Sequence, residues 1–209
     1  MRVDAHLKKE TTMSELKFEP FEKIGRLNRN CVISEKIDGT NAQIQFAADG
    51  DMLVGSRKRQ IWPEGTEGKN KGCDNAGFAG WSYANEKALF EFLGEGRHYG
   101  EWCGGKIQRG YGLTEKKFAL FNTGRWGEVP GHLLSVGLCV VPVLYEGEFT
   151  TDVVACAMED LNVQGSFFAK GYMNPEGVVV YHVATKTLFK VTYDHDNTGK
   201  GRNRQTDSA

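Results

Sequence analysis

Short segments that alternate apolar and polar residues, separated by turns, occupy most of this chain of 209 residues. In residues 41–46, apolar side chains recur at every second position from Ala42 to Phe46, which is typical of a strand with one buried face. The turn residues 48–51 follow, and then the apolar run 52–54, so this region predicts a β-hairpin. A chain built mainly from such units favours antiparallel sheets.

Further strands are expected where the sequence is apolar and β-prone, at residues 31–34, 136–144, 177–183 and 188–193. Residues 184–187 separate the last two runs, and we interpret them as the turn of a second hairpin.

Two segments have the spacing of amphipathic helices. In the first, the apolar residues on one face are Trp81, Ala84, Ala88, Leu89 and Phe92. Gly94 offers a stop to this helix. In the second, Thr150 or Thr151 can cap the start, Gly165 ends the region, and the apolar stripe is Val154, Ala157, Met158 and Leu161. Hairpins combined with two helices indicate an α+β domain of antiparallel sheets with flanking helices.

Length and composition favour one domain over residues 17–196. Residues 1–16 and 197–209 are polar and lack apolar anchors, which predicts a loose N-terminal extension and a mobile tail. The 26 Lys+Arg residues nearly balance the 27 Asp+Glu residues, so any contact with nucleic acid must come from a local patch. No stretch reads as a signal peptide or a membrane span, which predicts a soluble, cytoplasmic protein. The five cysteines include no C-x-x-C pair, which argues against a zinc site.

The stretch Ser34-Glu-Lys-Ile-Asp-Gly-Thr-Asn41 is the most informative part of the chain. Lys36 stands at the end of a β-prone run, and a turn glycine, Gly39, follows three residues later. A lysine so placed is anchored by a rigid strand while its amine stays free, as a lysine nucleophile requires. The alternative for this short pattern alone is a solvated lysine before an Asp-Gly turn.

Downstream residues extend this pattern into a series. The six motifs are Lys36-Ile-Asp-Gly39, Val54-Gly-Ser-Arg57, Tyr99-Gly-Glu101-Trp102, Phe118-Ala-Leu-Phe121-Asn122, Glu176-Gly-Val-Val-Val-Tyr181 and Leu188-Phe-Lys190-Val191. In composition and order they resemble the motifs of the covalent nucleotidyltransferases, the superfamily of ATP-dependent RNA ligases, DNA ligases and mRNA capping enzymes. The residues in and around these motifs are most similar to those of the RNA ligase branch, and within it to those of the short stand-alone RNA ligases of bacteriophages.

This resemblance implies a nucleotidyltransferase fold with ATP in the groove between the sheets, and ATP with Mg²⁺ or Mn²⁺ as cofactors. Lys36 would attack the α-phosphate of ATP and hold AMP, while Lys190 would neutralise the charge that builds on that phosphate. Glu176 would be the carboxylate on the metal side. In many ligases a second lysine follows two positions after the one matched by Lys190, and this chain has Thr192 there.

The remaining roles that the resemblance implies concern the nucleotide. Glu35 would read the adenine edge by its main chain or its carboxylate, and Phe121 would stack on the purine, with Phe118 as second choice. Glu101 would accept a hydrogen bond from a ribose hydroxyl. Arg57 and Asn41 would orient phosphate or ribose.

The implied reaction is RNA ligation by a monomer: adenylylation of Lys36, transfer of AMP to a 5′-phosphate, then attack by a 3′-hydroxyl. A DNA nick ligase core and a poorly active AMP-binding module remain alternatives. The strand, nicked or single, would be held by the domain itself or another chain, because the segments flanking Lys36 and Lys190 are short. Arg59, Lys106 and Arg109 are the candidates for this grip, with ordinary loop charge as the alternative.

Overall fold

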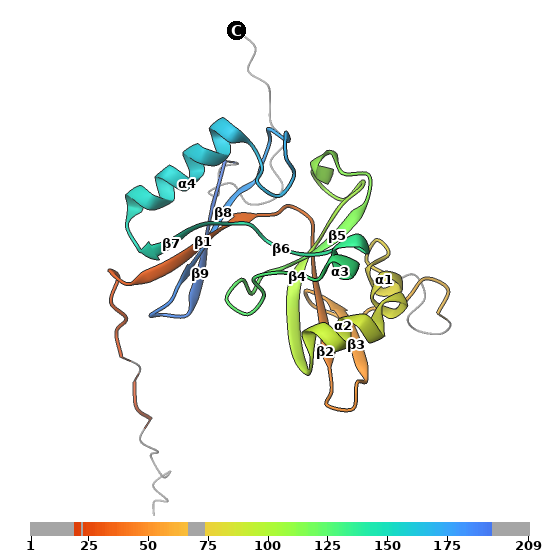
Figure 1. The fold of residues 1–209 in the computed structure, drawn as a ribbon. Coiled ribbons are helices and arrows are strands. Elements are labelled where there is room, and N and C mark those ends of the chain that lie inside the picture. Colours follow the sequence, from red (N-terminus) through yellow and green to blue (C-terminus); the bar gives the residue numbers. More distant parts are fainter. Residues whose placement is uncertain (1–18, 22, 67–73, 194–209) are drawn as a thin grey trace, which may run out of the picture.

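The computed structural model describes residues 19–21, 23–66 and 74–193. Their strands form two sheets that lie side by side (Figure 1). The expected extension 1–16 and tail 197–209 lie outside these residues. The α+β class is confirmed. Within the described residues, no helix is both long enough and apolar enough to cross a membrane.

The first sheet, sheet A, has the strand order β7-β1-β8-β9 and is antiparallel throughout. Its strands are β1 (Asn30–Lys36), β7 (Val143–Glu148), β8 (Gly177–His182) and β9 (Thr187–Thr192). The helix α4 (Thr151–Gln164) packs on one face, where Ala157 and Leu161 meet buried residues of β1 and β8. The Thr150 hydroxyl accepts a hydrogen bond from the Val153 N–H at 3.2 Å, so Thr150 is the N-cap.

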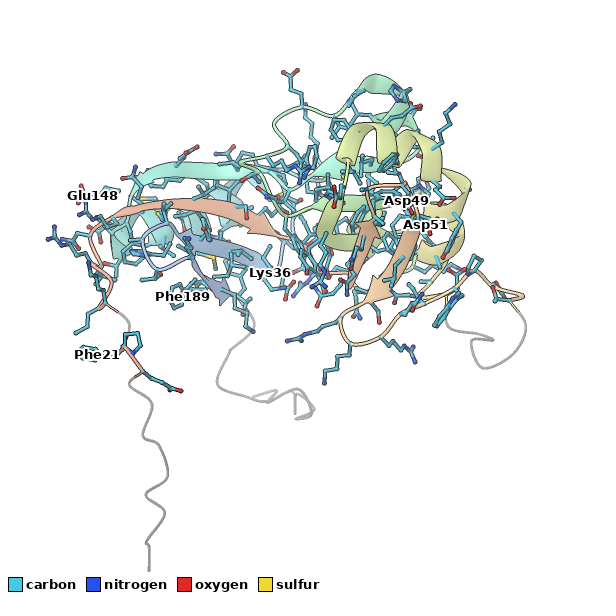
Figure 2. The ribbon with its side chains drawn as sticks, turned by 90° about the horizontal axis from the view of Figure 1, so that it is seen from below. Phe21, Lys36, Asp49, Asp51, Glu148 and Phe189 are labelled. Atoms are coloured by element: carbon cyan, nitrogen blue, oxygen red, sulfur yellow. The ribbon has the colours of Figure 1, made fainter. Side chains whose placement is uncertain are left out.

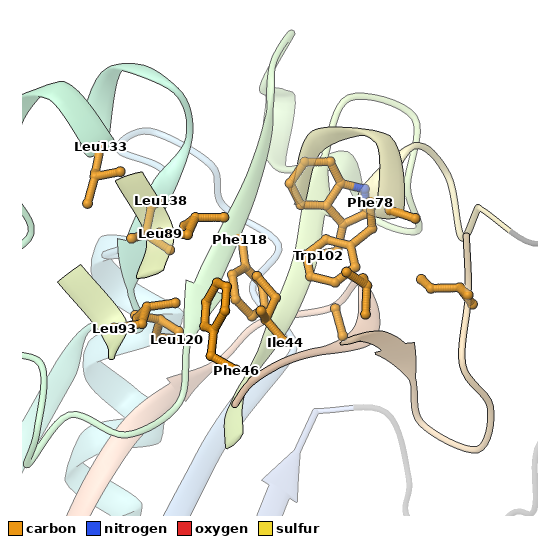
Figure 3. Close-up of a cluster of buried hydrophobic side chains, with 14 of the residues drawn as sticks. Ile44, Phe46, Phe78, Leu89, Leu93, Trp102, Phe118, Leu120, Leu133 and Leu138 are labelled. Carbon is orange, nitrogen blue, oxygen red and sulfur yellow. The ribbon is translucent and has the colours of Figure 1, made fainter. Parts of the chain in front are cut away.

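The second sheet, sheet B, has the order β3-β2-β4-β5-β6, in which only β5 and β6 run parallel. Its strands are β2 (Thr40–Phe46), β3 (Met52–Ser56), β4 (Gly96–Gly104), β5 (Lys116–Leu120) and β6 (Leu138–Val140). The helices α1 (Phe78–Ala84), α2 (Glu86–Leu93) and α3 (Gly131–Ser135) are associated with this sheet. Its core includes Phe46, Phe78 and Phe118 (Figure 3).

Two expectations about element bounds were wrong. The helix expected over residues 81–92 is two helices, because the backbone leaves helical geometry at Asn85 and the Asn85 side chain donates to the Trp81 carbonyl at 2.8 Å. The strand expected over residues 136–144 is also two: β6 belongs to sheet B and β7 to sheet A. Pro142 lies between them, where a residue without an N–H cannot continue a strand ladder.

Candidate active site

A groove of about 1240 Å³ lies between the two sheets. Side chains alternate along a strand, so the face of sheet A that does not pack on α4 presents Ser34 and Lys36 from β1 and Lys190 from β9. Sheet B contributes Asn41 and Glu101. The volume of the groove exceeds the range of about 300–1,000 Å³ that is usual for small-molecule pockets, so a bound nucleotide would leave space in it for a further group.

Lys36 ends β1 at the junction of the two sheets (Figure 2). Its Nζ donates to Glu176 Oε2 at 2.7 Å, and both side chains keep some exposure, 24% and 19%. Lys36 pairs with Gly177 in the sheet, which places Glu176 beside it. Gly177 has φ +143°, and a Cβ there would lie 2.1 Å from the Val191 carbonyl oxygen, so this close strand packing requires glycine after Glu176.

The turn after Lys36 is held by groups from sheet B and its loops. The Gly39 N–H donates to Glu101 Oε1 at 3.1 Å, and the Asp38 N–H donates to the Tyr111 hydroxyl at 2.9 Å. A Cβ on Gly39 would lie 2.4 Å from the Trp102 carbonyl oxygen, so only glycine allows this approach. The Lys-x-Asp-Gly pattern thus brings the lysine against the second sheet.

Glu101 is almost fully buried where the two sheets meet. It accepts hydrogen bonds from the Gly39 N–H and from Asn41 Nδ2, the latter at 2.9 Å. Burial raises the pKa of Glu101 from 4.5 to about 7, and the positive charge of Lys36 opposes this shift. The Glu101 and Asn41 side chains are therefore brought together.

Lys190 lies on the groove face of β9, in register with Val179, which in turn pairs with Ser34. Arg57 follows the end of β3 and lines the groove from sheet B. The structure thus brings Lys36, Glu176, Lys190, Glu101 and Arg57 to one groove. Within the described residues, no group of three or more His, Cys, Asp or Glu side chains could hold a metal ion by itself.

The two phenylalanines of the fourth motif have different positions. Phe121 lies just beyond β5, is 43% exposed and lines the groove. Phe118 is fully buried in the core of sheet B, with its ring centre 4.9 Å from that of Phe78. The second choice for the purine platform is therefore wrong, because the Phe118 ring cannot reach the groove without unpacking the core.

Glu35 has its carboxylate on the face of β1 opposite to Lys36. The side chain is 1% exposed and accepts hydrogen bonds from the Ser166 hydroxyl at 2.6 Å and the Phe168 N–H at 2.9 Å. Burial raises its pKa. The Glu35 carboxylate is thus occupied by hydrogen bonds inside the protein and cannot read the adenine edge as it stands. Of the two options expected for Glu35, the main chain remains.

Comparison with known proteins gives the family of the chain. The sequence model of the family described as RNA ligase matches residues 29–192. The chain belongs to the RNA ligase family. By sequence comparison alone, no curated protein matches it.

Solved RNA ligases from Naegleria gruberi have a similar fold. A mutant with ATP and Mn superposes with a TM-score of 0.55 and 18% identity, over 80% of this chain and 51% of that one. A mutant with AMP and Mn gives 0.54 and 19%, over 79% and 50%. An apo mutant gives 0.55 and 21%, over 79% and 50%. This RNA ligase family member spans about half the length of these structures.

The basic residues proposed for the strand grip of this ligase family member separate into distinct places. Arg59 lines the groove, whereas Lys106 is exposed outside it. Arg109 lies with its Nε 3.2 Å from Asp38 Oδ2 and supports the turn after Lys36, so its guanidinium has a contact within the protein. Arg97, which belongs to the same local run of basic residues, also lines the groove, as does Arg125, which sequence reasoning missed.

Proposed function

We propose that the chain is an ATP-dependent RNA ligase that works through a lysyl-AMP intermediate. Lys36 Nζ would form a bond to the α-phosphorus of ATP as pyrophosphate leaves, and AMP would then pass to the 5′-phosphate of a strand. Attack by a 3′-hydroxyl on that phosphate would release AMP and seal the strand. The observation that carries this proposal is the Lys36 amine at the junction of the two sheets, 2.7 Å from Glu176 and in one groove with Lys190.

The other groove residues support a nucleotide in this place. Phe121 presents a partly exposed ring that suits a flat purine. Glu101, with Asn41 beside it, would bind the ribose, and Arg57 would orient a phosphate. Lys190 would offset charge on the α-phosphate in the transition state. Two of the three Naegleria structures above are with ATP and Mn or with AMP and Mn, which agrees with ATP and a divalent metal as requirements here.

The groove residues supply only part of the ligands that a metal ion needs, which is the usual situation for Mg²⁺. Mg²⁺ is usually held by one or two carboxylates together with substrate phosphates and waters rather than by an all-protein cage. Glu176 is the carboxylate that would hold Mg²⁺ or Mn²⁺ in this way. When bound, the metal would supply positive charge beside the phosphates, and the protein would supply the lysine, the purine platform and the ribose contact.

The strand would lie along the same groove, because Arg57, Lys58 and Arg59 line it on the sheet B side. We favour RNA because the chain belongs to the RNA ligase family. The two alternatives, a DNA nick ligase core and a poorly active AMP-binding module, can be distinguished from an RNA ligase in a single sealing assay.

That assay presents ATP, Mg²⁺ or Mn²⁺, and nicked duplexes whose 5′-phosphate strand is RNA or DNA, together with single strands of each. We expect sealing of RNA and its loss in Lys36→Ala. Lys87→Ala is the matched control, since Lys87 is exposed on α2 and does not line the groove. Sealing of DNA alone would favour the nick ligase core, and lysine-AMP without sealing of any strand would contradict ligation.

A further inference from the structure

The loop between β4 and β5 contains a buried tyrosine whose hydroxyl contacts the backbone on both sides of Ile37. Tyr111 accepts a hydrogen bond from the Asp38 N–H at 2.9 Å and donates to the Lys36 carbonyl oxygen at 3.4 Å. It is 2% exposed and has φ +53°, a left-handed conformation that is uncommon for a bulky residue. Such a conformation persists where the surrounding structure imposes it, and it is frequent at functional positions.

The ring of Tyr111 connects this loop to sheet A. Its ring centre lies 4.9 Å from that of Tyr172 and 5.7 Å from that of Phe168, both in the segment that follows α4. The Phe168 N–H donates to the buried Glu35 carboxylate. Tyr111 therefore packs against the segment that holds β1 from behind, while its hydroxyl holds the turn in front.

We propose that Tyr111 is a positioning residue for the nucleophile: its hydroxyl fixes the backbone of Lys36 and Asp38, and through it the starting point of the lysine side chain. This inference rests on the proposed function. A lysine amine at the end of four methylenes can reach a phosphate in line only if its Cα is fixed, and small misplacements of reacting groups lower rates strongly. Asp38 receives a second support from Arg109, whose Nε lies 3.2 Å from Asp38 Oδ2, whereas the Tyr111 hydroxyl contacts both the Asp38 N–H and the Lys36 carbonyl.

The proposal separates the chemical steps. Formation of lysyl-AMP requires the Lys36 amine, whereas sealing of a strand that already carries a 5′-adenylate does not. A hydroxyl that only stabilised the fold would affect both steps equally. A hydroxyl that positions Lys36 should affect the steps in which Lys36 gains or gives up AMP and should spare the sealing of a strand that already carries a 5′-adenylate.

The test compares Tyr111→Phe with Tyr172→Phe. Each removes one hydroxyl and keeps its ring, but the Tyr172 hydroxyl contacts the Arg109 carbonyl and not the turn after Lys36. At saturating ATP, we expect the rate constant for lysyl-AMP formation to fall about 10- to 100-fold in Tyr111→Phe, with little change in the ATP concentration that gives half the maximal rate. Sealing of a 5′-adenylylated RNA should remain close to the wild-type rate, and Tyr172→Phe should match wild type in both assays.

A wild-type rate of lysyl-AMP formation in Tyr111→Phe would overturn the inference. An equal loss in both assays would also overturn it, because the hydroxyl would then be structural. If the wild-type chain forms no lysyl-AMP, the proposed function is wrong and the inference falls with it, an outcome distinct from failure of the variant alone.

Discussion

The carboxylate of Glu35 and the amine of Lys36 leave β1 on opposite faces, although the residues are neighbours in the chain. Successive side chains of a strand alternate between its faces, so Glu35 enters the protein interior where Lys36 enters the groove. The Glu35 carboxylate accepts hydrogen bonds from the Ser166 hydroxyl and the Phe168 N–H, and both residues lie after α4. The strand that presents the proposed nucleophile is therefore anchored from its rear face.

This anchoring predicts a stability effect at Ser166. Ser166→Ala would leave the buried Glu35 carboxylate without one hydrogen-bond donor, so the free energy of unfolding should fall by about 1–3 kcal/mol. Urea unfolding measures it. Ser135→Ala is the control, because the exposed Ser135 hydroxyl bonds only a nearby carbonyl, and it should change stability by less than about 0.5 kcal/mol. Equal, small effects in both variants would contradict the anchor.

The two phenylalanines of the fourth motif should respond differently to truncation. Phe118→Ala opens a cavity in the core of sheet B and should cost about 3–5 kcal/mol of unfolding free energy. Phe121→Ala removes a partly exposed ring, so stability should change little while ATP binding weakens by about tenfold through loss of stacking. Denaturant melts and nucleotide titrations separate the two effects. Unchanged ATP affinity in Phe121→Ala would remove Phe121 from the site.

The raised pKa of Glu101 predicts a pH-dependent stability. Its pKa is about 7 in the folded protein against an ordinary value of 4.5, so the folded state binds this proton more tightly than the unfolded state. The stabilising contribution of the proton is complete below the ordinary pKa and is lost as the pH rises through about 7. From about pH 5 to about pH 8, the melting temperature of wild type should therefore decline relative to that of Glu101→Gln. Parallel melting curves across this range would contradict the raised pKa.

The basic edge of the groove predicts a salt dependence of strand binding. Each phosphate contact on a single strand contributes about 0.7 to the slope of log affinity against log salt. Lys58→Ala combined with Arg59→Ala should lower this slope by about 1.4, if each residue contacts one phosphate. Lys87→Ala, outside the groove, should leave the slope as in wild type. Fluorescence anisotropy with labelled RNA measures it, and an unchanged slope in the double variant would place the grip elsewhere.

Local patterns in the sequence predicted the parts of the fold that depend on neighbouring residues. The hairpin of β2 and β3, the cap at Thr150 and the end of α4 at Gly165 follow from alternation and turn chemistry. The division of residues 136–144 at Pro142 depends on which sheet each half joins, which is set by distant partners. The pairing of β5 with β6 in parallel has the same cause.

The features of the candidate site likewise divide into those that the sequence predicts and those that depend on tertiary contacts. The motifs gave the groove residues on both sheets, because residue type and order are visible in the sequence. The inward direction of the Glu35 carboxylate and the use of Arg109 by Asp38 depend on tertiary contacts, so they were not visible. Arg97 was visible as part of a local basic run, and it precedes Tyr99 and Glu101 by two and four positions on one strand and shares their face, whereas no comparable pattern marked Arg125.

The central claim is that Lys36 carries AMP, and intact-mass spectrometry of the full chain after incubation with ATP and Mg²⁺ or Mn²⁺ tests it most directly. The account predicts one added AMP on wild type and on Lys87→Ala, its location at Lys36 after proteolysis, and none on Lys36→Ala. An unmodified wild-type chain, or an adduct that persists in Lys36→Ala, would contradict it.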